Sequence, residues 1–303
     1  MKPYVFAAIA LLLTVIASAA GQQHATTVRS ADLHASAADS SEKLMTLERG
    51  TDLVILQQRS ADNQPWLQVS VAVPGAAENQ PARAVTGWVS AKPIVSGSTA
   101  NADQIVYGEA VDSEQQAERR GGRKGAAEDA MRLYFEVAKL FPNSPLAAEA
   151  LWRSADIRWQ IDKAKGKASL EDRFLREVIS KFPGTKWADL AAFDLLDEQL
   201  CGAWNGLAEC PAKEAEAYER YAREHPQSPK FGEALFSAAF RQGSLVDIYR
   251  IANDKEKSNA AHNKALALAQ ELAGNAAQGE WRFRAADLVY KLQQNIALYG
   301  VSE

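Results

Sequence analysis

The sequence predicts two folded units of different class, a small all-β unit followed by an all-α solenoid of helical hairpins. Short runs of β-branched residues alternate with turn clusters over residues 26–95. A proline-containing junction then recurs three times at nearly constant spacing within residues 113–303, which indicates stacked helical repeats. The chain has 303 residues, 47% hydrophobic and 24% charged, as expected of a folded protein with two domains.

The composition excludes several classes of function. The formal net charge is −4, so there is no electrostatic case for a nucleic-acid partner. The chain has 18 Gly and 11 Pro, too few for a collagen-like or Pro-rich protein. Four His and two Cys leave little material for a multi-metal site, and we expect neither a metal nor a cofactor.

Residues 1–20 have the pattern of a secretory signal peptide. Lys2 supplies a positive charge, residues 5–17 are apolar apart from Thr14, and Ser18 and Ala20 are small residues at a cleavage site after position 20. The alternative is an uncleaved N-terminal anchor. With cleavage, the protein is periplasmic or secreted and has no membrane span.

The β unit is predicted from four segments in order. They are residues 44–47 with a turn at 48–50, residues 53–56, residues 66–71 and residues 85–89. In the third segment, Leu67, Val69 and Val71 alternate with more polar positions, as in a half-buried strand. Strands this short and this closely spaced predict a small barrel or sandwich.

The order of these segments resembles a bacterial SH3-like (SH3b) domain. The resemblance rests on the first strand with Leu33, the turn ending in Gly50, the Trp-bearing strand 66–71 and the closing Gly87-Trp88-Val89. It implies a small barrel over residues 26–95 that binds cell-wall glycan, stem peptide or a protein segment. Trp66 and Trp88 are the candidate ligand contacts, and packing in the core is the alternative role for both.

A linker is predicted over residues 96–112. Residues 95–102 are small and polar, whereas residues 103–112 fit either a last strand or an extension. A helical pattern begins at Ser113. The basic segment Arg119-Arg-Gly-Gly-Arg-Lys-Gly125 lacks the spacing of a phosphate-binding loop, so we interpret it as a solvated hinge or helix start.

The repeats are marked by Pro142, Pro183 and Pro226, which are spaced 41 and 43 residues apart. Apolar residues lie 3, 4 and 7 positions before the residue that ends each first helix, just ahead of the proline, and therefore share one helical face. The matching sets are Tyr134, Leu175 and Tyr218; Val137, Val178 and Tyr221; and Ala138, Ile179 and Ala222. The helix-end position holds Phe141, Phe182 and His225, and we interpret His225 as a packing residue.

A second helix follows each proline. Ser144, Thr185 and Ser228 are the expected N-caps. Small residues and then bulky aromatic residues follow at matching positions: Ala150, Ala191 and Ala234, then Trp152, Phe193 and Phe236. A fourth helix pair without the proline signature is predicted over residues 257–298. Since one helix pair cannot bury its faces alone, the pairs are expected to stack.

These repeats resemble tetratricopeptide-like repeats, and their junction is similar to that in helical scaffolds of outer-membrane assembly and envelope-coordination proteins. The resemblance covers residues 113–303 and implies a protein partner bound on the concave face that the first helices line. No ligand residue transfers individually.

Cys201 and Cys210 are the only cysteines. In an oxidising compartment they are expected to form a disulfide, since eight intervening residues with Gly202, Asn205 and Gly206 can turn back. Two separate buried thiols are the alternative. Zinc binding by two cysteines alone is not expected, and a Cys-x-x-Cys redox motif is absent from the sequence.

No recognised catalytic motif is present in the sequence, and carboxylates such as Glu149 and Asp156 fit solvated helix faces or ion pairs. We therefore predict a non-enzymatic adaptor that binds an envelope ligand, peptidoglycan or peptide, through the β unit and an envelope protein through the repeats. One alternative is an envelope assembly scaffold with purely protein ligands. A second is a cryptic cell-wall hydrolase, whose carboxylates would come together only in three dimensions.

Overall fold

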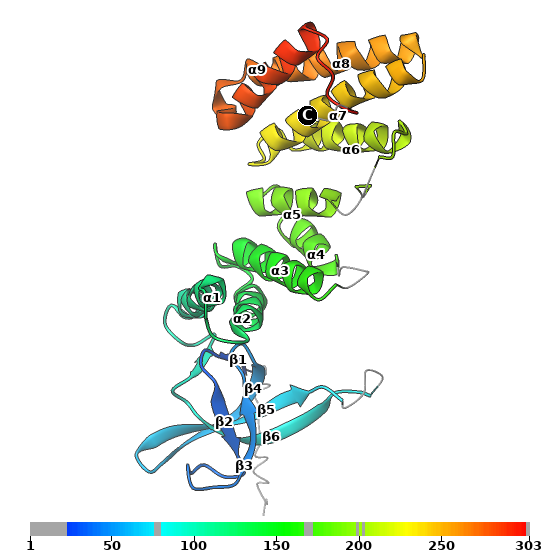
Figure 1. The fold of residues 1–303 in the computed structure, drawn as a ribbon. Helices are drawn as coiled ribbons and strands as arrows, with labels where there is room; N and C mark the ends of the chain where they lie inside the picture. Colours follow the sequence, from blue (N-terminus) through cyan, green and yellow to red (C-terminus); the bar gives the residue numbers. More distant parts are fainter. Residues whose placement is uncertain (1–22, 76–79, 167–171, 198–199, 202–203, 301–303) are drawn as a thin grey trace, which may run out of the picture. The chain divides into compact units, whose positions relative to one another are not determined.

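The computed structural model describes residues 23–75, 80–166, 172–197, 200–201 and 204–300 (Figure 1). The predicted signal peptide, residues 1–20, lies outside these residues. The chain divides into two compact units, residues 1–100 and residues 101–303. We call them the strand unit and the helical unit.

The strand unit is a single antiparallel sheet of seven strands within the described residues. The strands are β1 Gln23–Thr27, β2 Ala31–His34, β3 Lys43–Leu47, β4 Asp52–Ala61, β5 Gln64–Val73, β6 Arg83–Ser90 and β7 Ile94–Ser96. Their spatial order is β3-β2-β6-β5-β4-β1-β7. Among the described strands, β3 and β7 each pair with one neighbour only, so the sheet is open and the predicted closed barrel is not seen.

The hairpin of β4 and β5 is longer than the sequence predicts. Asp62 and Asn63 connect the strands with φ of 51° and 58°. Two successive left-handed residues are the conformation of a type I′ turn, which matches the twist of the flanking strands, and Asp and Asn tolerate it well. Pairing therefore continues from Ala61 opposite Gln64 down both strands.

The predicted alternation in β5 is confirmed. Leu67, Val69 and Val71 are buried and pack in one cluster with Leu53 of β4 and Val89 of β6. One face of the sheet thus carries an aliphatic core, as expected where successive side chains point to opposite faces.

The helical unit follows as nine α-helices within the described residues. They are α1 Ala102–Glu118, α2 Ala126–Leu140, α3 Ala147–Ala164, α4 Arg173–Lys181, α5 Lys186–Asp197, α6 Glu209–Glu224, α7 Phe231–Ile251, α8 Lys255–Ala273 and α9 Gly279–Gln293, with a 3₁₀ turn η1 Ala276–Gln278. Figure 1 shows the two helices of a pair, such as α6 and α7, lying side by side.

The predicted linker differs from the structure. Residues 103–112 lie in α1 rather than in a strand or an extended connection. The reason is tertiary packing: Val106 and Ala110 are fully buried where α1 packs against α2, although the segment has little helical patterning. The basic segment 119–125 connects α1 to α2 and ends at Gly125, the N-cap of α2, as predicted.

The three prolines lie in the turns between α2 and α3, α4 and α5, and α6 and α7, which confirms the helix-turn-helix unit. The backbone repeats closely at these turns. Phe141, Phe182 and His225 end the first helices with φ of −127°, −127° and −125°, and each donates its N–H to the carbonyl four residues earlier.

Two of the three predicted N-caps lie further from their helices than expected. Thr185 directly precedes α5 and accepts a hydrogen bond from the N–H of Ala188, as an N-cap does. Ser144 and Ser228 lie three residues before their helices and accept from the N–H groups of Leu146 and Lys230, which forms a turn ahead of the helix. The first-helix positions chosen from the spacing are buried, with Ile179 partly so.

The fourth pair is formed by α8 and α9, as predicted for residues 257–298. Ala285, Leu288 and Leu292 of α9 are buried against the preceding pair. Among the described residues, no helix combines the length and apolar character needed to cross a bilayer.

Candidate functional site

The two tryptophans that the sequence analysis proposed as ligand contacts are buried. Trp66 of β5 is 2% exposed and Trp88 of β6 is 7% exposed, and both pack with Ala37. His34 meets the ring of Trp66 edge to face at 5.7 Å, and the Arg59 guanidinium lies 4.4 Å from the Trp88 ring centroid. The burial fits the alternative role, core packing, and leaves neither ring face open to a ligand.

The loop after β2 accounts for this burial. It folds back on itself through a hydrogen bond from the N–H of Ala35 to the carbonyl of Glu42. The Nδ1 of His34 lies 3.0 Å from the carbonyl of Ser41. Beside it, Gly87 of β6 approaches β2 so closely that a Cβ would lie 2.8 Å from the His34 carbonyl oxygen. The loop therefore covers the sheet face that carries both indoles.

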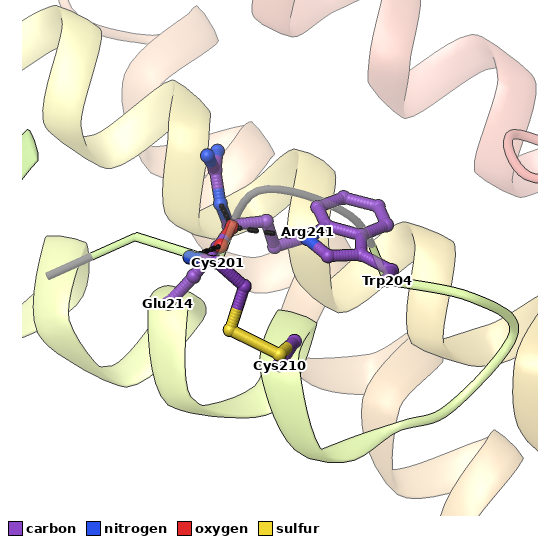
Figure 2. Close-up of a disulfide and its surroundings, with 5 residues drawn as sticks. All are labelled: Cys201, Trp204, Cys210, Glu214 and Arg241. Atoms are coloured by element: carbon purple, nitrogen blue, oxygen red, sulfur yellow. Dashed lines mark hydrogen bonds and ion pairs between the residues drawn. A yellow bond between two sulfur atoms is a disulfide. The ribbon is translucent and has the colours of Figure 1, made fainter. Parts of the chain in front are cut away.

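The predicted disulfide between Cys201 and Cys210 is present, and Figure 2 shows its surroundings. The Cα atoms of the two cysteines are 5.9 Å apart, within the usual range. Cys210 lies in the first turn of α6, and Cys201 lies in the connection between α5 and α6. The bond ties this connection to the start of the third repeat.

A buried carboxylate holds the same connection. Glu214 of α6 is 2% exposed and accepts hydrogen bonds from the Cys201 N–H at 2.8 Å and from Trp204 Nε1 at 3.2 Å (Figure 2). Arg241 of α7 donates to it through Nε at 2.7 Å and stacks on the ring of Tyr218 at 4.4 Å. Since three donors already use this carboxylate, its role is structural.

A second polar cluster joins α1, α2 and α3. Glu114 accepts from the Tyr134 hydroxyl at 2.7 Å and from Arg153 at 2.9 Å. Burial and the hydrogen bond to Glu114 raise the pKa of Tyr134. Burial and a hydrogen bond with Glu149 raise the pKa of Tyr107 to about 12. Both phenols therefore keep their protons near neutral pH.

Two carboxylates line one small cavity of the helical unit. They are Asp156 of α3 and Asp194 of α5, and burial raises the pKa of Asp156. The cavity measures about 50 Å³, against roughly 300–1,000 Å³ for ordinary ligand pockets. Asp194 also accepts a hydrogen bond from Trp152 Nε1. A sugar ring does not fit between these groups.

The first helices of the last two pairs border a charged groove of about 530 Å³. Glu219 of α6, a buried residue in its lining, pairs with Arg223 and with Lys264 of α8, the latter at 2.6 Å. Glu216, Arg220 and Glu224 complete the charged lining. The groove is thus lined by charges of both signs, and its buried carboxylate is already neutralised from within the chain.

The second helices α7 and α9 border a groove of a different kind, about 620 Å³ in volume. We call it the aromatic groove and define it by Phe236, Phe240, Phe283, Arg284, Leu288 and Leu298. Its apolar lining, its size and its place between helices are typical of binding sites.

The aromatic groove is organised by stacking. Phe236 stacks on Phe240 with ring centroids 6.2 Å apart and meets Trp281 of α9 at 5.6 Å. The guanidinium of Arg284 lies 4.8 Å from the Phe236 ring and 4.5 Å from the Trp281 ring. Phe283 projects into solvent and is 67% exposed. An exposed aromatic ring beside a stacked arginine is the composition of a protein-interface hot spot.

Only part of this groove was predicted from the sequence. Phe236 was placed in the aromatic set of the repeat and Leu288 in the fourth pair, but the binding surface was assigned to the first helices. Trp281 also belongs to the predicted fourth pair, and it packs against the core. The missed signal is Arg282-Phe283-Arg284, where an aromatic residue lies between two arginines.

No group of three or more His, Cys, Asp or Glu side chains suited to a metal ion occurs in the described part of the chain. No protein-family model matches the sequence, and a search of curated proteins finds no match either.

Solved structures give weak similarities. The "DHF58 filament" shares 17% identity at a TM-score of 0.24, and the alignment covers 64% of this chain and 93% of that one. The "de novo designed helical repeat protein DHR64" shares 19% identity at a TM-score of 0.22, with 64% and 94% covered. The "DHF79 filament" shares 18% identity at a TM-score of 0.22, and the alignment covers 62% of this chain and 97% of that one. The description of the second unit as helical repeats therefore rests on its own helix pairs.

Proposed function

We propose that the protein is a non-enzymatic adaptor of the cell envelope, in which the helical unit binds a protein partner and the strand unit binds an envelope ligand. The aromatic groove is the observation that carries the proposal. It leaves Phe283 exposed beside Arg284, whereas the aromatic residues at the matching repeat positions, Trp152, Phe193 and Phe236, all pack on other rings.

The disulfide supports an extracytoplasmic setting. Disulfides persist in oxidising compartments, and the Cys201–Cys210 bond closes a short connection in the helical unit. Periplasmic or secreted localisation after signal cleavage remains part of this proposal.

The strand unit is proposed to be an SH3-like module that binds peptidoglycan or a peptide. The burial of Trp66 and Trp88 moves the expected contact away from their rings. Among the described strands, β3 is an edge strand with mostly exposed residues, and an exposed edge can add a strand from a peptide.

This burial also favours a second candidate, an assembly scaffold with purely protein ligands. Sugar rings are commonly bound on exposed aromatic faces, and neither indole offers one here, whereas a strand edge and the aromatic groove both suit polypeptides. The third candidate, a cell-wall hydrolase, gains no support from the small cavity beside Asp156.

Sedimentation with purified cell-wall sacculi separates the first two candidates. Residues 21–303, 21–100 and 101–303 are each mixed with sacculi and pelleted. Pelleting of the first two but not the third is expected for an adaptor with a wall-binding strand unit. If none pellets, the wall ligand is wrong and the scaffold candidate replaces it. Soluble muropeptides in the supernatant would contradict both and indicate a hydrolase.

A further inference from the structure

We propose that the aromatic groove binds a segment of a partner protein in which an aromatic or aliphatic side chain lies next to a carboxylate. The inference rests on the proposed function, because it names the chemistry of the partner that the helical unit binds.

The charge of the groove argues for the carboxylate. Asp287, the carboxylate in the lining, is paired with Lys291 at 2.8 Å on the same helix. Arg284 stacks on two rings and has no ion-pair partner among the described residues. Arg282, which stacks on Phe283 at 4.9 Å, has none there either. The charge left unneutralised beside the rings is therefore positive, although the chain as a whole carries −4.

The stacking makes that charge available to a ligand. A guanidinium that lies over aromatic rings can still donate its in-plane N–H groups, and these donors suit a carboxylate. Because the rings beside it exclude water from one face, a bound carboxylate is less screened than at an open surface. The apolar side chain of the same segment would cover Phe283 and enter the lining formed by Phe240, Leu288 and Leu298.

Charge complementarity also argues against a second copy of this chain as the occupant. A two-fold contact brings the same surface patch of both copies together. Pairing this groove with itself would place Arg282 and Arg284 opposite their own counterparts, and like charges in such a contact are unfavourable.

The charged groove on the first helices is a weaker candidate for the same role. Its buried carboxylate, Glu219, already has two cationic partners, Arg223 and Lys264. A ligand there would have to displace existing ion pairs, whereas the aromatic groove offers an unpaired arginine.

The test uses random 12-residue peptides displayed on phage and selected on the disulfide-bonded protein. We expect the selected peptides to carry Asp or Glu within two positions of Phe, Trp, Leu or Ile. A selected peptide, labelled with a fluorophore, is then titrated with wild-type protein and with Arg284→Glu and Phe283→Ala variants. Each variant is expected to weaken binding by about tenfold or more.

Two control variants match these changes elsewhere in the helical unit. Lys255→Glu makes the same change of charge at the start of α8, in a different pocket, and Ile251→Ala removes an exposed apolar side chain at the end of α7. Both should leave the dissociation constant within about twofold of wild type. A peptide with its carboxylate replaced by Lys should bind Arg284→Glu better than it binds wild type.

Three outcomes would overturn the inference. Peptides that depend on Phe283 but bind without a carboxylate would leave the proposed protein-binding role standing and remove the acidic partner. Peptides unaffected by either variant, or no selected peptide at all, would remove the groove as the binding surface. A dimer in sedimentation velocity that Phe283→Ala dissociates would assign the groove to a second copy.

Discussion

The two units use their aromatic residues in opposite ways. In the strand unit, Trp66 and Trp88 lie beneath a folded loop and one arginine. In the helical unit, Phe283 projects into solvent beside Arg284 at the end of the stack. The rings of the strand unit pack within its fold, whereas Phe283 of the aromatic groove is exposed, and we propose that it contacts a partner. Residue type alone therefore does not separate a binding residue from a core residue.

The units also differ in whether charged side chains are buried in them. The buried clusters of the strand unit are apolar. The helical unit buries carboxylates that pair with arginines: Asp129 with Arg123, Glu214 with Arg241, and Asp247 with Arg250. Removing one partner of a buried pair is costly because it leaves a charge without compensation. We expect the helical unit to be sensitive at its ion pairs and the strand unit at its indoles.

Replacing Glu214 by Ala should give the largest loss. The change leaves Arg241 without its carboxylate and removes the acceptor for the Cys201 N–H. We therefore expect the free energy of unfolding to fall by about 3–5 kcal/mol. Urea denaturation followed by circular dichroism measures this. Glu216→Ala, at an exposed position two residues away, is the control and should stay within about 0.5 kcal/mol of wild type. Equal effects of the two variants would contradict the buried-pair account.

Trp66→Ala should destabilise the strand unit by about 3–5 kcal/mol, since it leaves a large cavity under the loop. Hydrogen exchange read by mass spectrometry should show lost protection in β4, β5 and β6, with α6 to α9 unchanged. Leu56→Ala, at a half-exposed position on β4, is the control. Protection lost equally in both units would show that they do not unfold separately.

Removing the disulfide sharpens the comparison within the helical unit. Cys201→Ser with Cys210→Ser frees a loop of about ten residues, and the chain-entropy estimate for such a loop is about 2–3 kcal/mol. Exchange should rise in the connection before α6 and not in the strand unit. No change in the denaturation midpoint would mean that Glu214 alone holds the connection.

Alkaline pH should destabilise the helical unit through its buried phenols. The pKa of Tyr107 is raised from 10 to about 12, so the folded state keeps a proton that the unfolded state loses. Its contribution to stability is complete below pH 10 and is lost as the pH rises through about 12. Tyrosinate absorbance should show Tyr107 ionising near pH 12, a step that Tyr107→Phe removes. Ionisation of every tyrosine near pH 10 would contradict the burial.

The smallest effect is expected at Arg59, which covers Trp88. Arg59→Ala removes one exposed cation-π contact, worth about 0.5–1 kcal/mol. The more sensitive readout is quenching of tryptophan fluorescence by acrylamide, which should increase as Trp88 opens to solvent. Unchanged quenching would mean that the loop after β2 alone protects the indole.

Much of the fold could be predicted from the sequence because it follows from local spacing. Pro142, Pro183 and Pro226 located the turns of three helix pairs, and the positions before them located the buried faces. The part of helix α1 before Ser113 was missed because burial of Val106 and Ala110 forms it, rather than a strong pattern of its own. Closure of the sheet was expected from the family resemblance, but the pairing between strands distant in the sequence leaves the described sheet open.

The candidate site was less predictable because exposure is a tertiary property. Trp66 lies on the sheet face opposite the aliphatic core, where alternation predicts exposure, and a loop with no hydrophobic pattern buries it. Phe236 follows the repeat, but its surroundings change at the last pair, where α9 brings Trp281 and Arg284 beside it. Only the three-dimensional arrangement distinguishes that aromatic position from its two counterparts.

In the proposed adaptor, one chain holds an envelope ligand and a protein segment at the same time. The direct measurement is co-sedimentation of the labelled groove peptide with sacculi in the presence of the protein. We predict that the peptide pellets only when the protein is present, and that Arg284→Glu abolishes pelleting of the peptide while the protein itself still pellets. If the protein pellets while the peptide stays in the supernatant, or if the peptide releases the protein from sacculi, the adaptor account is contradicted.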